Sequence, residues 1–373
     1  MTTAVESLPA RIREARTAVK MTAADLAAQL GVHRNTVLNY ENGSTEPPTS
    51  QLLRIGQLLG CGLLDLLGLG APQPAPRFAF RANKPAQRRP EVLATARRLL
   101  RTYQEIEELL EAPLQDRLPR RQLDMPSSRQ VEVIAEEVRE LCGLAEVGPA
   151  SIVQALESIG VRGRLYRFDE PGLDGLSVQQ GGMSLILLNQ AQPRVERVLF
   201  SAAHELGHLV LHQQLFADAD SDGEDEQVEK EADQFAAALL VPESKLLDHW
   251  QADRLARAPL VHALIALKEV FPVSVWCLVR RVQELGLVGE VDYARLTADI
   301  KHLLGIPRAQ RTRKQDLEPA PLPPAELQVP TRFSRLVRLA YVGDVIGVAK
   351  VAELLEVPVD EAKEVVARWV RPY

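Results

Sequence analysis

The chain has 373 residues, about two to three times the usual length of one domain, so we expect at least two folded units. Hydrophobic residues make up 46% of the chain and charged residues 25%, which excludes a collagenous, disordered or membrane-embedded protein. The net charge of −6 is unevenly spread, because residues 71–130 carry a net +5 and residues 131–290 a net −13. This division indicates that different regions serve different partners.

The apolar runs and the cysteines indicate a cytoplasmic protein. The richest apolar run, Leu52–Leu69, is interrupted by charged and polar residues, and the N-terminus lacks the basic-then-apolar pattern of a signal peptide. The cysteines, Cys61, Cys142 and Cys277, are odd in number and far apart, which supports neither a disulfide framework nor a thiolate metal site. We therefore expect a cytoplasmic protein with no membrane partner.

Two proline clusters, 71–90 and 319–330, are interpreted as extended connectors. The expected fold class is multidomain: an all-α N-terminal head, an α+β domain with a small antiparallel sheet, and a small all-α C-terminal module. The expected boundaries are 1–70 for the head, 71–127 for a basic proline-rich linker and bridging helix, 128–290 for the α+β domain, 291–330 for a second linker, and 331–373 for the C-terminal module.

The head contains a helix-turn-helix pattern. Thr22 is the predicted N-cap of a helix that ends at Gly31, and a second short helix follows through Tyr40. One side of the second helix is apolar, while the other is polar and can meet base edges in the major groove. The alternative is a helix-turn-helix used only for protein contacts or dimerisation.

The segments Thr22–Val32, Asn39–Gly43 and Leu52–Leu59 resemble the xenobiotic-response-element (XRE) helix-turn-helix domain of phage-type repressors, over roughly residues 8–67. The resemblance implies that the second helix reads a double-stranded DNA operator. By this resemblance, the residues expected to read the operator are Arg34, Asn35, Thr36 and Asn39. The family often has glutamine where this chain has Ala23, so one contact to the DNA backbone is in question. We also expect a homodimer.

A basic stretch and a long helix follow the head. Between Pro90 and Leu118, apolar residues recur at helical spacing and predict one amphipathic bridging helix. Eight basic residues lie before this helix and in its first part, and the same stretch contains only one acidic residue, Glu91. Such a density of positive charge suits contact with DNA phosphates; a solvated run of charges is the alternative. The basic residues are Arg77, Arg81, Lys84, Arg88, Arg89, Arg97, Arg98 and Arg101.

The middle domain is expected to collect helices around one small antiparallel sheet, which makes it α+β. The predicted strands are Arg162–Phe168, Leu176–Gln180 and Ser184–Asn189, the last two joined by a Gly181-Gly182 turn. The predicted helices are Ser128–Leu141, Ala150–Ser158, Val195–His212, Glu226–Leu240 and Val273–Leu285.

The most specific signal is His204-Glu-Leu-Gly-His208 on one of these helices. Residues four apart share a helix face, so both imidazoles can approach one zinc ion, and Glu205 can act as the general base. His212 lies eight residues along the same face, about 12 Å away, too far to share that ion. It is therefore interpreted as a packed or hydrogen-bonded histidine.

The next helix offers Glu229 and Glu231 as a third ligand. Asp233 lies one helical turn beyond Glu229, where its carboxylate can receive the free ring N–H of a ligand histidine. This arrangement favours Glu229, with Asp233 as its supporting residue.

Arg197–His212 and Glu229–Pro242, with Gly148–Ile152 and Leu156–Val161 upstream and Phe271–Val275 downstream, resemble the ImmA/IrrE family of metallo-endopeptidases. The resemblance spans roughly residues 128–290 and implies a gluzincin-like domain. It also implies Zn²⁺, with Mn²⁺ as the alternative, bound by three residues, and a catalytic glutamate. The ligands implied are His204, His208 and Glu229, and the general base is Glu205.

The resemblance further implies a protein substrate, typically a helix-turn-helix repressor, or the protein's own chain. Family members relieve repression of genes for mobile-element transfer or the response to DNA damage and other stress. Fusion of an XRE domain to this peptidase in one chain is typical of regulators. The alternative function is a non-proteolytic regulator whose metallopeptidase-like domain acts as a sensor or interaction module.

Two features stay open. Asp218–Glu229 fits the spacing of a calcium loop, although Glu229 cannot easily chelate calcium while it binds zinc; an acidic solvated loop is the alternative. Val345–Leu355 and Val359–Val370 predict two C-terminal helices, of which Ala349–Leu355 resembles the first helix of a second helix-turn-helix. Glu356 stands where such a turn usually has glycine, so a dimerisation or sensing module competes with a second DNA reader.

Overall fold

The structure, a computed structural model, describes residues 7–69, 77–82, 90–121, 127–144, 152–170, 172–192, 194–216, 226–323 and 330–370. Within these ranges the buried apolar side chains gather in three clusters, one in the head and one on each face of a central sheet. No helix among the described residues is long and apolar enough to cross a membrane. The expectation of a multidomain protein is confirmed.

The head consists of five helices, α1 (Leu8–Ala18), α2 (Ala23–Leu30), α3 (Arg34–Asn42), α4 (Thr49–Leu59) and α5 (Leu63–Leu67). Thr22 caps α2 as expected: its side chain accepts from the Asp25 N–H, and the Asp25 carboxylate accepts from the Thr22 N–H. Gly31 ends α2 in the left-handed conformation, with φ of 69°. The predicted second helix, α3, continues two residues beyond Tyr40.

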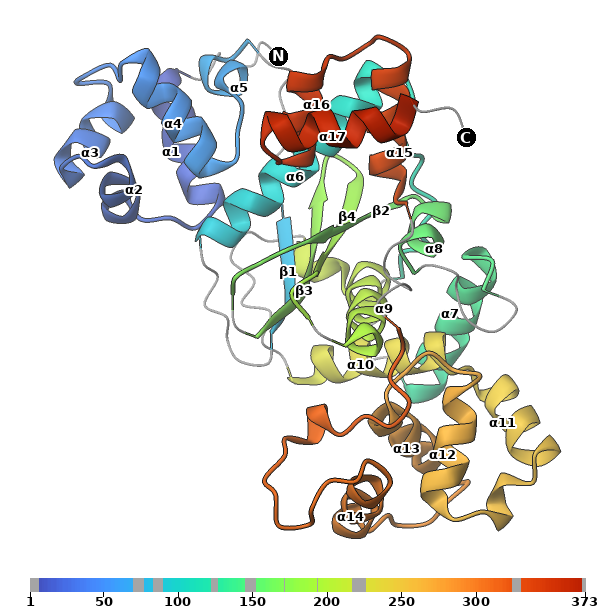
Figure 1. The fold of residues 1–373 in the computed structure, drawn as a ribbon. Coiled ribbons are helices and arrows are strands. Elements are labelled where there is room, and N and C mark those ends of the chain that lie inside the picture. Colours follow the sequence, from blue (N-terminus) through green and yellow to red (C-terminus); the bar gives the residue numbers. More distant parts are fainter. Residues whose placement is uncertain are drawn as a thin grey trace.

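Helix α6 (Pro90–Leu109) belongs to two cores. Leu93 and Ala94, near its start, are buried in the head, whereas Leu99 and Ile106 are buried against the central sheet and the C-terminal helices. Figure 1 shows α6 running from the head to the red C-terminal helices. The expected bridging helix is therefore present, but it packs along its length and is no free connector.

In the described part of the chain, the sheet has four strands in the order β1-β3-β4-β2. They are β1 (Arg77–Ala82), β2 (Val161–Tyr166), β3 (Leu173–Gln180) and β4 (Met183–Asn189). β3 and β4 form the expected antiparallel hairpin, and positive φ values of 56° and 82° at Gly181 and Gly182 permit its tight turn. β1 was not expected, since its residues lay in the predicted linker; it pairs antiparallel with β3 at the sheet edge.

The expectation that the whole sheet is antiparallel is wrong. β2 pairs with β4 in parallel, from Val161 opposite Ser184 to Tyr166 opposite Asn189. The reason is placement: β2 docks on the side of β4 away from β3, where it runs in the same direction as β4. Strands that are covered on both faces suit such pairing, and both strands are largely buried.

Alternate residues of β4 point to opposite faces of the sheet. Ile186 and Leu188 join the cluster that contains helix α9 (Val195–Leu211), whereas Leu185 and Leu187 join the cluster that contains α6 and the C-terminal helices. The sheet is thus a layer between α9 on one face and α6 with the C-terminal helices on the other (Figure 1).

The remaining helical elements surround these layers. They are α7 (Ser128–Leu141), α8 (Ile152–Ser158), η1 (Gln213–Phe216), α10 (Glu226–Leu240), α11 (Glu243–Ala252), η2 (Leu255–Arg257), α12 (Leu260–Lys268), α13 (Val275–Glu284), α14 (Tyr293–Leu303), η3 (Lys314–Asp316), α15 (Arg332–Val342), α16 (Val348–Leu355) and α17 (Val359–Val370).

Much of 291–330, expected to be a linker, packs on the middle domain. Leu296 and Ile300 of α14, and Leu317 beyond it, are buried in the same core as α9. Nearby, the buried Lys268 ammonium lies 3.0 Å from a Glu196 carboxylate oxygen and 2.8 Å from a Glu318 oxygen. These apolar and ionic contacts tie the segment to the domain.

The C-terminal helices α15, α16 and α17 also differ from the expected separate module, because they share one core with α6 and the sheet. Arg332 on α15 forms an ion pair with Glu107 on α6. Glu356 ends α16 with φ of 57°, and its carboxylate lies 2.9 Å from the Arg98 guanidinium on α6. The residue that replaces the expected turn glycine therefore anchors the module to α6.

Candidate functional site

Close packing of α9 against α10 brings the predicted site together. A Cβ added at Gly207, in the middle of α9, would lie 3.1 Å from the Phe235 ring and 3.3 Å from the Ala232 Cα on α10. Glycine at this position therefore allows α10 to approach α9 closely. As a result, Glu229, in the first turn of α10, lies beside the two histidines of α9.

His204, His208 and Glu229 form the one group of possible metal ligands found in the described part of the chain. The two Nε2 atoms are 2.9 Å apart, and each lies 3.3 Å from an oxygen of the Glu229 carboxylate. Tetrahedral ligands about 2.0–2.1 Å from one zinc ion lie about 3.3 Å from each other. Two imidazoles and a carboxylate at these separations fit a divalent metal such as zinc.

Asp233 supports the first of these histidines. Its carboxylate oxygen lies 2.9 Å from Nδ1 of His204, which is buried. A carboxylate accepts the proton of Nδ1, so the lone pair of His204 is on Nε2, which faces His208 and Glu229. Asp233 thus occupies the place that the sequence spacing predicted for it.

His208 is supported by a second chain of contacts. Its Nδ1 lies 3.0 Å from Nδ1 of His212, whose Nε2 lies 3.1 Å from the Glu231 carboxylate. Burial, followed by the neighbouring His208, lowers the pKa of His212 to about 4, so His212 is neutral at pH 7. With its proton directed to Glu231, His212 accepts from His208 and leaves Nε2 of His208 free for a metal.

These contacts show what His212 and Glu231 bind in the structure. His212 is hydrogen-bonded rather than part of the candidate ligand group, as its distance along α9 predicted. Glu231 contacts His212 and lies outside that group.

Glu205 is buried on α9, on the side that faces the sheet. The Ser177 hydroxyl on β3 donates a hydrogen bond of 2.7 Å to the Glu205 carboxylate. A Cβ at Gly175, two residues earlier on β3, would lie 3.5 Å from Cγ of Glu205. Sequence reasoning missed Ser177, although a lone hydroxyl between Leu176 and Val178 in a buried strand was an available signal.

The predicted DNA-reading residues lie together on α3. Arg34 and Asn35 are exposed, and Thr36 and Asn39 are half-buried. Val37, on the opposite side of the helix, is buried in the head core. Figure 1 places α3 at the outer end of the head, away from the sheet.

Part of the predicted basic arm is used inside the protein. The Arg97 guanidinium donates to the Ala15 carbonyl at 3.5 Å, and Arg98 pairs with Glu356. Both arginines therefore make contacts within the protein. Lys84, Arg88 and Arg89 lie outside the described residues, as does Asp218–Asp225, the acidic part of the predicted calcium loop.

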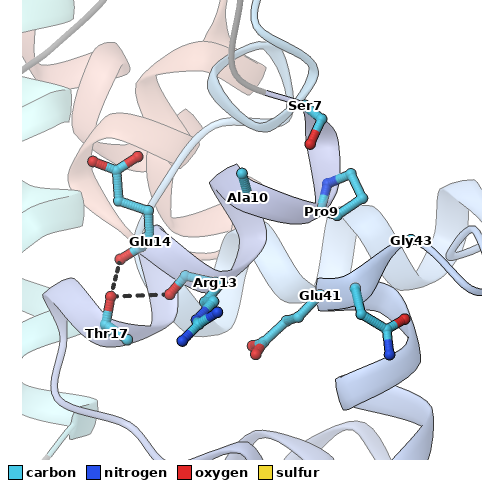
Figure 2. A pocket seen from close by; sticks show the side chains of 9 residues that line it. Ser7, Pro9, Ala10, Arg13, Glu14, Thr17, Glu41 and Gly43 are labelled. Atoms are coloured by element: carbon cyan, nitrogen blue, oxygen red, sulfur yellow. Dashed lines mark hydrogen bonds between the residues drawn. The ribbon is translucent and has the colours of Figure 1, made fainter.

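A hollow in the head lies between α1 and the end of α3 (Figure 2). Thr17 on its wall donates to the carbonyls of Arg13 and Glu14, at 3.0 and 2.9 Å. Glu41 at the same wall is paired with Arg16 at 2.6 Å. These polar groups already have partners within the head, and the hollow contains none of the candidate metal ligands.

The fold and the site together define a class of protein: a helix-turn-helix head joined to an α+β domain with the donor set of a metallopeptidase. Comparison with family models supports both halves. Residues 12–66 match the helix-turn-helix family, and residues 156–283 match the family described as the IrrE N-terminal-like domain. The chain is therefore a fusion of an XRE-type helix-turn-helix domain with an IrrE/ImmA-like domain. A comparison with curated proteins gives no match.

Proposed function

We propose that this protein is a cytoplasmic, DNA-binding transcriptional regulator with a zinc-dependent endopeptidase domain. The observation that carries the proposal is the convergence of His204, His208 and Glu229, with the buried carboxylate of Glu205 on the same helix as the two histidines. The cleaved chain is a partner helix-turn-helix repressor or the protein itself, and cleavage relieves repression in a stress, DNA-damage or mobile-element response.

His204, His208 and Glu229 would hold the metal, which is Zn²⁺ or Mn²⁺. Such an ion, when bound, makes water more acidic and polarises the carbonyl of a peptide bond. Glu205 would accept the proton of the attacking water and pass it to the departing amine. The Ser177 hydrogen bond holds the Glu205 carboxylate in one orientation for both transfers. Burial around these residues limits the access of bulk water.

The DNA-reading role is assigned to Arg34, Asn35, Thr36 and Asn39 on α3. Their exposed or half-buried positions on the outer end of the head allow α3 to enter a major groove without unfolding α6. A homodimer would place two such helices on a palindromic operator. Because α6 is buried in both the head and the sheet cores, a change in one domain can reach the other through one rigid helix.

The decisive experiment compares the wild type with Glu205→Gln, each with zinc, with manganese or after chelation. Substrates are the protein's own chain and co-expressed helix-turn-helix repressors, and mass spectrometry identifies new termini. Glu140→Gln, at an exposed position on α7, is the matched control. Cleavage by the wild type and Glu140→Gln but not by Glu205→Gln supports the peptidase; no cleavage by any protein supports the non-proteolytic sensor instead.

The DNA half is tested separately by selection from random duplexes. The wild type should enrich one operator, while Arg34→Ala and Asn39→Ala should lose sequence preference and retain salt-sensitive background binding. A selection with the wild type that enriches no sequence contradicts the DNA-reading role.

A further inference from the structure

β3 is the strand that meets the candidate catalytic carboxylate. Ser177 donates its hydroxyl to Glu205 at 2.7 Å, and Gly175 is so close that a Cβ there would touch the Glu205 side chain. On the inner side β3 pairs with β4, with Ser177 opposite Ile186. The outer side of β3 is therefore the sheet edge nearest to Glu205.

β1 occupies that outer edge at the same point along the strand. Ala79 lies opposite Ser177, and Arg81 lies opposite Gly175. Neighbouring strands in a sheet are about 4.8 Å apart. The backbone of β1 therefore passes within one strand spacing of the residue that holds Glu205, and it also lies beside α9 and η1.

β1 comes from outside the domain whose sheet it extends. The match to the IrrE N-terminal-like family covers residues 156–283, which include β2, β3 and β4 but not residues 77–82. Without β1, β3 would be an edge strand with a row of unpaired backbone N–H and C=O groups. The connection between the head and α6 supplies the segment that covers this row.

A free edge of this kind binds extended peptides, because a peptide backbone can add to it as a further strand. An endopeptidase must hold its substrate extended beside its general base, and only the outer edge of β3 meets that requirement next to Glu205 among the described strands. Charge also suits β1 as an occupant. Residues 77–82 contain two arginines and no acid, whereas residues 131–290 carry a net charge of −13.

We propose that the outer edge of β3 is the binding surface for an extended peptide, and that residues 77–82 of this chain occupy it as a resident strand. This inference rests on the proposed peptidase function. It adds that the substrate binds in an extended conformation and that β1, in the same chain, competes with the substrate for β3. A substrate segment must displace β1 before it can pair with β3.

The test measures peptide binding in the Glu205→Gln background, so that cleavage is not required. The probe is a fluorescein-labelled decapeptide with the sequence of residues 75–84, and a scrambled decapeptide is the control. Two variants change the edge. In the first, residues 77–82 are replaced by alternating glycine and serine, which frees β3. In the second, Phe78→Cys with Val178→Cys joins a directly opposed pair by a disulfide, which locks β1 in place.

We expect the glycine-serine variant to bind the decapeptide at least tenfold more tightly than the Glu205→Gln protein in which residues 77–82 are unchanged. In the latter, β1 is tethered to the same chain and competes with the decapeptide at an effective concentration of about millimolar. The oxidised form of the Phe78→Cys, Val178→Cys variant, called the oxidised lock, should not bind the decapeptide. Reduction of its disulfide should restore the affinity of the protein in which residues 77–82 are unchanged. Since the reduced and oxidised lock are the same protein, a folding defect cannot produce their difference.

The inference is overturned if the decapeptide binds the oxidised lock as tightly as the reduced form, if no variant binds it, or if the scrambled peptide binds equally. These results are independent of peptidase activity. Failure of the wild type to cleave any substrate would contradict the proposed function. The binding of the decapeptide at the β3 edge would still be decided by the binding measurements alone.

Discussion

Ser177 on β3 and Glu205 on α9 are joined by a hydrogen bond of 2.7 Å, in which the serine hydroxyl donates to the carboxylate. Both side chains are fully buried. The bond connects the sheet to the helix that carries both candidate histidine ligands. A buried carboxylate that accepts such a bond has one preferred orientation, and this relationship leads to the first prediction.

Ser177→Ala should reduce kcat for peptide cleavage by about tenfold or more, because a hydrogen bond to a charged group contributes about 1.5–3 kcal/mol. KM should change less than twofold, since the lost bond orients the base rather than the substrate. Ser184→Ala is the control, because Ser184 is equally buried on the neighbouring strand and pairs in register with Gln179. Steady-state kinetics on one peptide substrate separate kcat from KM. Equal losses in the two variants would show a structural effect only.

Asp233→Ala should weaken zinc binding about 10–100-fold, because partners that orient a ligand histidine typically contribute that much. The structural reason is the 2.9 Å contact between Asp233 and Nδ1 of His204. Glu226→Gln is the control, since Glu226 lies on the same helix but pairs with Lys230. Competition for zinc with a chromophoric chelator measures both affinities. An unchanged affinity in Asp233→Ala would contradict the role assigned to Asp233.

Metal removal should destabilise the wild type. A ligand that binds only the folded protein at 100 times its dissociation constant adds about 2.7 kcal/mol to the free energy of unfolding. Chelation should therefore lower Tm in the wild type and leave it unchanged in His208→Ala, which lacks one of the three converging donors. Thermal unfolding with and without chelator checks this. A metal-dependent Tm in His208→Ala would place the metal elsewhere.

Glu157 on α8 should make stability depend on pH. Burial raises the pKa of Glu157 from 4.5 to about 7, although the Arg332 N–H, 2.6 Å away, and Arg335 oppose the shift. Because the folded protein holds this proton more tightly, the stabilising contribution is complete below pH 4.5 and is lost as pH rises through 7.

From pH 5 to pH 8 the free energy of unfolding of the wild type should therefore fall relative to Glu157→Gln, by up to about 3 kcal/mol. Denaturant titrations at each pH measure the difference. Glu140→Gln, at an exposed position, should show no such pH-dependent difference. A difference between wild type and Glu157→Gln that is constant with pH would exclude titration of Glu157 as its cause.

Local patterns predicted the elements with strong periodicity. The predicted bounds of α7, α10 and α17 agree with the structure, because their apolar spacing and flanking residues are unambiguous. The spacing of His204, Glu205 and His208 placed them correctly on α9 for the same reason. β1 could not be predicted from its own sequence, since six residues between proline-rich segments become a strand only through pairing with β3, nearly 100 residues later.

The supporting contacts were predicted unevenly. The position of Asp233 could be predicted from the sequence because it lies one helical turn from Glu229. The contact of Ser177 with Glu205 could not, because it joins residues 28 apart on a strand and a helix. Such a contact depends on how α9 crosses the sheet, which no local periodicity encodes. The docking of the C-terminal helices on α6 was missed for a similar reason, because Arg98 and Glu356 are 258 residues apart.

The docking of the head on α6 should depend on Gly60. Gly31 and Gly60 end α2 and α4 in the same left-handed conformation, with φ of 69° and 66°. A Cβ at Gly31 would have nothing within 4 Å, whereas a Cβ at Gly60 would lie 2.0 Å from the Ala94 carbonyl oxygen on α6. Gly31→Ala should therefore cost only the backbone strain of about 1–2 kcal/mol. Gly60→Ala should cost about 1–3 kcal/mol more, because backbone atoms must move apart. Small-angle X-ray scattering should show a larger radius of gyration for Gly60→Ala alone, as the head separates from α6; equal radii in the two variants would mean that the head does not depend on this contact.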